Sequence, residues 1–226
     1  MKRDAGGADF IGSSLSAVIF DVDGVLVQSM ERHYESYQKA FDSIGLKIRR
    51  ESVFDHEGRG SRDIIRQILG ESDVCVSPAE EEALNAAKQR AFASFGPMPM
   101  YPGAREMIEA FHDEGLKLAL VTGTVRRNVE AHFPDLVARF DSIVTADDVT
   151  RTKPDPEPYL KAVQKIALPP ERCVVVENAP LGIRAAKAAE LRVVAITSTL
   201  PADRLRQADW IVRDVFEARR VVEGLR

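Results

Sequence analysis

Residues 16–26 read SAVIFDVDGVL, an apolar run that ends abruptly in two aspartates and a glycine. The run at 16–20 is short, continuous and rich in β-forming residues, which predicts a buried strand. Side chains alternate along an extended chain, so Asp21 and Asp23 are expected to point the same way. Two like charges this close repel unless a cation lies between them or one holds a proton, and a hard divalent metal meets that need. Gly24 lets the backbone turn and approach a ligand closely.

The rest of the chain alternates strand patterns with helix patterns. Apolar runs predict further strands at residues 117–121, 142–144, 173–176, 192–196 and 210–212. Helical spacing of apolar residues predicts helices at residues 104–112, 158–166 and 181–190. This alternation predicts an α/β fold with a parallel sheet and helices on both faces, in which a ligand binds beyond the carboxyl ends of the strands.

The region between the first two strands has a different character, because it contains helix patterns and no convincing strand. The expected helices cover residues 31–44, 62–69 and 78–95. Ser77, Pro78 and Glu80 form a helix-start signature at the last of these. We interpret the region as an inserted helical cap; the alternative is three extra helices within a single domain. The predicted division is a tail at 1–15, a core at 16–29 and 100–226, and a cap at 30–99.

Polar residues follow the second predicted strand directly. Thr122, Gly123 and Thr124 place hydroxyl and backbone N–H groups at a strand-to-helix turn, which suits a phosphate or another oxyanion. Thr124 could equally cap the following helix.

Two further candidates lie at the same rim of the predicted sheet. Lys153 lies in the stiff, proline-rich loop 152–158, where its ammonium group could neutralise a phosphate and a carboxylate. Its alternative role is that of an exposed lysine before a helix. Glu177 and Asn178 end the strand at 173–176 and could complete a metal shell, although Asn178 could also cap the next helix.

Composition sets limits on partners and on location. The chain has 226 residues and a formal net charge of −4, with no basic excess that would favour nucleic acid. It contains no long apolar run that would span a membrane, and its first residues do not form a signal-peptide pattern. Cys75 and Cys173 form neither a metal-spaced pair nor a disulfide framework. We therefore expect a cytoplasmic protein, and a monomer because no dimer signature is visible.

Taken together, these motifs resemble those of the haloacid dehalogenase superfamily. The first motif is the segment DVDGVL at 21–26, the second is Thr122, the third is Lys153 in its Lys-Pro-Asp-Pro context, and the fourth is the segment ENAPLGI at 177–183. The match extends from about residue 16 to 210. The branch that the chain is most similar to contains β-phosphoglucomutase and phosphoglycolate phosphatase. The resemblance implies a Rossmann-like three-layer core and a small helical cap inserted after the first strand.

The resemblance also implies chemical roles. Asp21 would attack phosphorus and carry an aspartyl-phosphate, and Asp23 would protonate the leaving oxygen and later activate water. Thr122 would hydrogen-bond the phosphoryl group, and Lys153 would balance charge. Mg²⁺ would be held by Asp21, by the backbone carbonyl of Asp23 and by the fourth motif, Glu177 and Asn178. Gly24, His33, Arg62, Gly123 and Thr124 would contribute to binding the substrate.

Two residues refine the expected activity. Dehalogenases of the superfamily lack an acid two residues after the nucleophile, since halide leaves unprotonated, so Asp23 favours phosphoryl transfer. Many relatives have aspartate where this chain has Asn178, and an amide oxygen is a weaker Mg²⁺ ligand than a carboxylate. We expect activity to survive this difference, with Glu177 taking more of the load or with lower metal affinity.

The resulting prediction is a Mg²⁺-dependent phosphatase that acts on a small phosphorylated metabolite, such as a sugar phosphate or a phosphoglycolate-like compound. A sugar phosphate mutase of the β-phosphoglucomutase type is the alternative enzyme. His33 lies where the mutase has a histidine, and Arg90 lies near the position of its cap lysine. Arg62, in a predicted specificity loop, could hold a second phosphate or an acidic group, and the alternative for both arginines is a solvated helix surface. A non-catalytic binding module on the same fold is the alternative from another class.

Overall fold

The computed structural model describes residues 14–226 except 133 and 136, so most of the predicted tail lies outside the described residues. The described part of the chain forms one six-stranded parallel sheet with the order β3-β2-β1-β4-β5-β6. The strands are β1 (Ala17–Phe20), β2 (Lys117–Val121), β3 (Ser142–Val144), β4 (Cys173–Glu177), β5 (Arg192–Ile196) and β6 (Trp210–Val212). The predicted α/β fold is confirmed.

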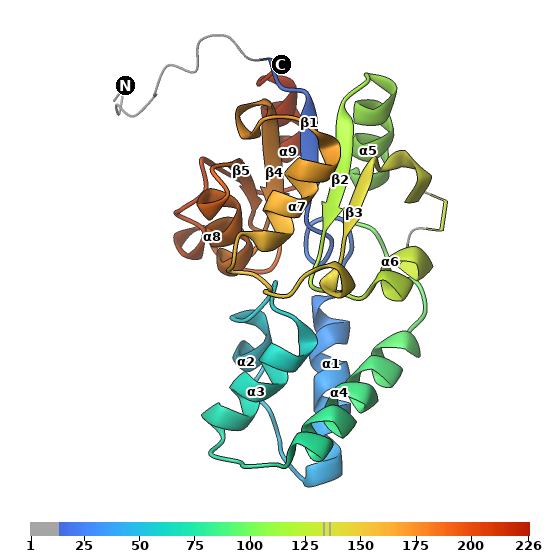
Figure 1. Cartoon of the computed structure of the whole chain (residues 1–226), viewed down its shortest axis with the longest axis vertical. Coiled ribbons are helices and arrows are strands. Elements are labelled where there is room, and N and C mark those ends of the chain that lie inside the picture. The colour runs from blue at the N-terminus through green and yellow to red at the C-terminus, as the bar shows by residue number, and fades with distance from the viewer. Residues whose placement is uncertain (1–13, 133, 136) are drawn as a thin grey trace.

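Helices cover both faces of this sheet (Figure 1). The α-helices that follow the cap are α5 (Ala104–Asp113), α6 (Arg126–His132), α7 (Glu157–Ile166), α8 (Pro180–Ala188) and α9 (Val215–Glu223). In β1, Val18 and Phe20 face the apolar cluster formed with α5 and α9, whereas Ala17 and Ile19 face the cluster formed with α7 and α8. Both faces of β1 are fully buried, which explains its continuous apolar sequence.

A helical cap lies between β1 and β2 in the sequence. In space it lies beyond the carboxyl ends of the strands (Figure 1). Its helices are α1 (Met30–Phe41), α2 (Glu51–Phe54), α3 (Ser61–Glu71) and α4 (Pro78–Ala93). Three isoleucines of α3, Ile64, Ile65 and Ile68, lie at helical spacing and are buried in the cap's own apolar cluster. The predicted capping box at Ser77 is present. The boundaries of the cap at 30–99 stay a prediction.

Short 3₁₀ helices connect several elements, at Asp42–Ile44, Val137–Arg139, Ala146–Asp148, Pro170–Arg172 and Ala202–Arg204. Leu15, at the end of the predicted tail, is buried in the cluster beside α5. Both cysteines are free, and Cys173 is buried at the start of β4. No helix in the described residues is long and apolar enough to cross a membrane.

The central strand offers a test of how far core packing holds the fold together. Ile19 is fully buried in β1, whereas Ile211 in β6 is 39% exposed. We expect Ile19→Ala to lower the free energy of unfolding by about 2–5 kcal/mol, because it removes buried methyl groups and leaves a cavity. The matched control Ile211→Ala is expected to cost less than about 1 kcal/mol, as is usual for surface positions. Urea unfolding measures both, and equal losses would contradict this packing.

Candidate active site

The carboxyl ends of neighbouring strands gather the polar residues at one place. Asp21 follows β1, Thr122 follows β2, and Glu177 is the last residue of β4. Lys153 reaches the same edge from the loop between β3 and α7. The two strands that flank β1 in the sheet are β2 and β4, so the strand order reverses at β1. That reversal is where open α/β sheets bind their ligands.

Lys153 is buried between two carboxylates. Its Nζ donates to Asp21 Oδ1 at 2.5 Å, to Glu177 Oε1 at 2.7 Å and to the backbone carbonyl of Val121 at 3.3 Å. Burial alone would lower the pKa of this ammonium group, but the charges of Asp21 and Glu177 raise it well above its usual value. Lys153 is therefore a fixed cation beside Asp21, and the alternative of an exposed lysine is excluded because only 2% of it is exposed.

Glu177 is held by the protein on both of its carboxylate oxygens. Oε1 accepts from Lys153 and, at 2.9 Å, from the hydroxyl of Tyr159. Oε2 accepts from the backbone N–H groups of Asn178 and Ala179 at 2.8 and 3.0 Å. A Cβ on Gly182 would lie 1.6 Å from Oε1, so the glycine makes room for this carboxylate. These contacts favour a role for Glu177 in positioning Lys153, and its predicted contact with Mg²⁺ stays a prediction.

Asp23 is positioned by hydroxyl groups and by a histidine. Oδ1 accepts from Ser29 and lies 2.9 Å from Nε2 of His33. Oδ2 accepts from Thr122 at 3.3 Å and from Thr124 at 3.1 Å. Thr124 therefore binds the carboxylate, and its alternative role as the cap of α6 stays a prediction. The two aspartates of the first motif have different partners, which allows them different chemical roles.

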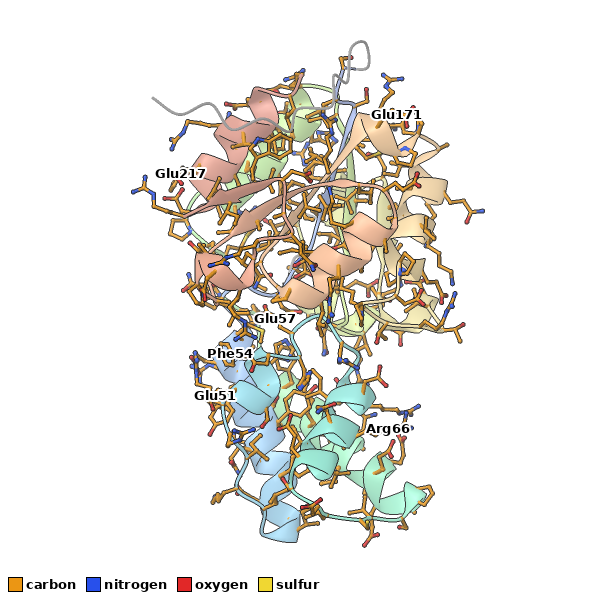
Figure 2. The ribbon with its side chains drawn as sticks, turned by 90° about the vertical axis from the view of Figure 1, so that its left-hand side faces the viewer. Glu51, Phe54, Glu57, Arg66, Glu171 and Glu217 are labelled. Carbon is orange, nitrogen blue, oxygen red and sulfur yellow. The ribbon has the colours of Figure 1, made fainter. Side chains whose placement is uncertain are left out.

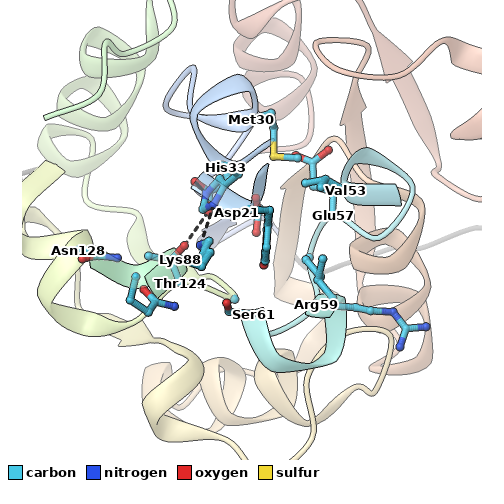
Figure 3. Close-up of a pocket in the computed structure, with 16 residues that line it drawn as sticks. Asp21, Met30, His33, Val53, Glu57, Arg59, Ser61, Lys88, Thr124 and Asn128 are labelled. Atoms are coloured by element: carbon cyan, nitrogen blue, oxygen red, sulfur yellow. Dashed lines mark hydrogen bonds and ion pairs between the residues drawn. The ribbon is translucent and has the colours of Figure 1, made fainter. Parts of the chain in front are cut away.

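A lysine of the cap completes this network, and it was not among the predicted site residues. Nζ of Lys88, in α4, lies 3.2 Å from Nδ1 of His33 (Figure 3). The ring of His33 stacks on that of Phe92. Burial lowers the pKa of Lys88 from 10.5 to about 8, against the opposing effect of the Asp23 charge. Leu84, Lys88 and Phe92 are the buried residues of α4 and lie four positions apart. This spacing can be read from the sequence, and it indicates Lys88, not Arg90, as the cap cation of the site.

The arginines of the cap lie elsewhere. Arg62, the predicted phosphate ligand, pairs with Glu82 at 2.7 Å, and its side chain is 58% exposed. The structure does not place Arg62 in the pocket beside Asp21, because the first turn of α3 directs it towards α4. Arg59 lines that pocket, although its guanidinium group points away from Asp21 in Figure 3. Arg90 lines a separate surface cavity with Arg127 and Asp147.

The cap is closed over the pocket. A Cβ on Gly123 would lie 2.8 Å from the backbone oxygen of Arg59, so the cap loop at 57–60 contacts the core directly. Asp63 of the cap accepts from Thr152 of the core at 2.8 Å. The pocket lined by Asp21, Asp23, His33, Lys88, Gly123 and Thr124 has a volume of about 40 Å³. That space holds a few water molecules and no sugar phosphate.

Glu57 of the cap and Asn178 of the core are hydrogen-bonded where the cap meets the core. Nδ2 of Asn178 donates to Oε1 of Glu57 at 2.6 Å and to the hydroxyl of Thr199 at 2.9 Å. Thr199 in turn donates to Oε2 of Glu57 at 3.0 Å. Burial raises the pKa of Glu57 well above its usual value, despite the hydrogen bond from Asn178. Asn178 is not the cap of α8, because that position belongs to Ala179.

The carboxylates of the site would hold Mg²⁺ only together with other oxygen ligands, such as water, substrate phosphate and an amide oxygen. Among the described residues, no group of three or more His, Cys, Asp and Glu side chains is arranged to hold a metal ion. Mg²⁺ commonly uses one or two carboxylates together with waters and substrate phosphate, so such a group is not required. Asn178 is fully buried, and its Oδ1 has no hydrogen-bond partner. This orphaned oxygen belongs to a residue at the same rim of the sheet as Asp21, and it fits a metal site.

Comparisons with known proteins agree with this geometry. A family model described as haloacid dehalogenase-like hydrolase matches residues 15–190. Protein CbbY of Rhodobacter capsulatus is 32% identical over 90% of this chain and 95% of its own length. A phosphorylated carbohydrates phosphatase of Thermotoga maritima is 31% identical over 82% of this chain and 87% of its own. A solved structure described as a β-phosphoglucomutase candidate from Bacteroides vulgatus is 33% identical, with a TM-score of 0.84 over 96% of this chain and 90% of that one.

The buried lysine of the cap yields a prediction about stability and pH. The unfolded chain binds a proton on Lys88 more tightly than the folded one, so this group costs stability below pH 8, and the cost disappears as the pH rises from about 8 to 10.5. A pKa lowered by that much corresponds to roughly 3 kcal/mol, at about 1.4 kcal/mol for each pH unit. We expect Lys88→Met to raise the free energy of unfolding at pH 7 by up to this amount.

Denaturant unfolding between pH 7 and 10 measures this effect. The gain from Lys88→Met should shrink steadily with rising pH, while the exposed control Lys47→Met should show no such trend. A difference between Lys88→Met and the wild type that stays constant over this range would contradict the assignment.

Proposed function

The chain belongs to the haloacid dehalogenase-like hydrolases, and we propose that it is a Mg²⁺-dependent phosphatase acting on a small phosphorylated metabolite. A sugar phosphate is the favoured substrate class, and a phosphoglycolate-like compound is the alternative. The observation that carries the proposal is the buried ion pair of Lys153 and Asp21, with Asp23 close by on separate partners. The relatives include phosphatases named for phosphorylated carbohydrates. We further propose a cytoplasmic monomer.

In the first step of the proposed reaction, a carboxylate oxygen of Asp21 attacks phosphorus. The bond from phosphorus to the substrate oxygen breaks, and Asp23 donates a proton to that leaving oxygen. Thr122 lies at this edge of the sheet and can hydrogen-bond the phosphoryl oxygens. Lys153 offsets the repulsion between the carboxylate of Asp21 and the phosphate. The result is an aspartyl-phosphate on Asp21 and a free alcohol.

In the second step, Asp23 accepts a proton from water as the water oxygen attacks the same phosphorus. The bond from phosphorus to Asp21 breaks, and inorganic phosphate leaves with Asp21 restored. Dividing the transfer in this way replaces one difficult step by two easier ones. Asp21, the backbone carbonyl of Asp23 and Asn178 are the residues proposed to hold Mg²⁺, with Glu177 behind them. When bound there, Mg²⁺ would reduce the charge repulsion around the phosphoryl group.

The closed cap implies a motion in the catalytic cycle. A pocket of about 40 Å³ has no room for a sugar phosphate, so the cap must open to admit it. His33 and Lys88 belong to the cap; in the closed form His33 contacts Asp23, and Lys88 contacts His33. We propose that closure places this pair at the proton-transferring carboxylate and excludes bulk water.

A phosphomutase is the second candidate, and the same contacts favour it. The Lys88–His33–Asp23 chain ties the cap to the acid–base residue, which would protect a phosphoryl-enzyme while a bisphosphate reorients. The solved structure at 33% identity described as a β-phosphoglucomutase candidate adds weight. We favour hydrolysis, because Arg62 does not lie in the pocket to hold a second phosphate.

Phosphate release from a panel of small phosphorylated metabolites, with and without Mg²⁺, tests the proposal. We expect release that depends on Mg²⁺ and that Asp21→Asn abolishes. The panel includes β-glucose 1-phosphate with a trace of the bisphosphate, checked for glucose 6-phosphate. Isomerisation without phosphate release would identify the mutase instead. Full activity in folded Asp21→Asn would refute the proposed nucleophile, and inactivity of the folded wild type across the panel would favour the non-catalytic alternative.

A further inference from the structure

Glu57 is a carboxylate of the cap that lies within the core site. It belongs to the segment between α2 and α3, and Figure 2 shows it where the cap meets the sheet-containing part of the chain. Only 4% of the residue is exposed. Its Oε1 lies 2.7 Å from where a Cβ on Gly24 would be, so it contacts the turn that follows Asp21 and Asp23. Glu57 therefore approaches the first and fourth motifs at the same time.

This buried carboxylate has no cationic partner among the residues that the structure describes. Its hydrogen bonds come from the amide of Asn178 and the hydroxyl of Thr199, which are both neutral. Lys153, the nearby buried cation, donates to Asp21 and Glu177 instead. A buried carboxylate is costly unless a cation or several hydrogen bonds compensate it. The position of Glu57 indicates a cation that the protein itself does not supply.

Asn178 provides the complementary observation. Its Nδ2 faces Glu57, while its Oδ1 is buried without a hydrogen-bond partner. Half a turn of the amide exchanges these two atoms, after which an amide oxygen and a carboxylate oxygen face each other. Two acceptors in contact are unfavourable unless a cation lies between them. A hard dication that prefers oxygen ligands satisfies both residues.

The charges of the core make such a carboxylate useful. Lys153 compensates the charge of Asp21, and the oxygens of Glu177 are occupied by donors from the protein. Asn178 contributes no charge. Asp21, Glu177 and Lys153 together therefore leave one uncompensated negative charge, fewer than a dication carries, and Glu57, hydrogen-bonded to Asn178, can add a second.

We propose that Glu57 supplies, from the cap, a carboxylate oxygen to the Mg²⁺ held at Asp21 and Asn178. This inference rests on the proposed function, because the Mg²⁺ ion is part of that proposal. It makes metal affinity dependent on the position of the cap. The ion then binds most tightly when the cap is closed, and opening of the cap removes one of its ligands.

Titration calorimetry with MgCl₂ on the full chain measures the affinity directly, without turnover. We expect Glu57→Gln to weaken Mg²⁺ binding by about tenfold or more, in the range seen when groups that support a metal site are removed. The control Glu51→Gln removes the same charge from an exposed position of the cap, seen in Figure 2, and should bind Mg²⁺ as the wild type does. Thermal unfolding checks that the variants are folded.

A second variant separates a ligand from a merely structural contact. Asn178→Asp places a carboxylate in the core, so it should tighten Mg²⁺ binding, and adding Glu57→Gln to it should cost less affinity than in the wild type. Equal Mg²⁺ affinity of Glu57→Gln and the wild type would overturn the inference while the proposed function stands. A wild type that binds no Mg²⁺ would overturn both.

Discussion

The ammonium group of Lys153, buried between Asp21 and Glu177, is the interaction on which the rest of the site depends. It joins the loop after β3 to the ends of β1 and β4, so three segments distant in the sequence are fixed against one cation. A buried ion pair is tolerated only with good geometry and with its other oxygens satisfied. Tyr159, the N–H groups at the start of α8 and the space left by Gly182 meet that condition for Glu177.

The cap contributes further residues to the site that the core forms around Lys153. Its loop contacts Gly123 and brings Glu57 to Asn178, and its helices bring His33 to Asp23 and Lys88 to His33. The core thus orients the proposed nucleophile independently of the cap, whereas the proposed acid–base group gains its contact with His33, and the proposed metal site gains Glu57, only when the cap is closed. An enzyme of this design would assemble its full chemistry only around a bound substrate.

The sequence was sufficient for the sheet and for the residues at its rim, because both follow from local pattern. Buried strands are continuous apolar runs, and in a parallel sheet their carboxyl ends share one edge, so Asp21, Thr122 and Glu177 could be placed together. The four-residue α2 is too short for periodicity to detect, and the valines of α9 favour strand as much as helix. Glu57 and the exposed direction of Arg62 depend on how the cap packs, which no local pattern encodes. Lys88 was detectable on the apolar stripe of α4, where a lysine is exceptional.

The central claim is that Asp21 carries the phosphoryl group. Intact-protein mass spectrometry of Asp23→Asn, mixed with Mg²⁺ and a phosphoryl donor whose leaving group departs unprotonated, such as p-nitrophenyl phosphate, tests it directly, because this variant should still form the aspartyl-phosphate and hydrolyse it slowly. We expect added mass equal to one phosphoryl group, located on the peptide that contains Asp21 and absent from the Asp21→Asn/Asp23→Asn double variant. A phosphoryl group on another residue, or one that persists in the double variant, would contradict it.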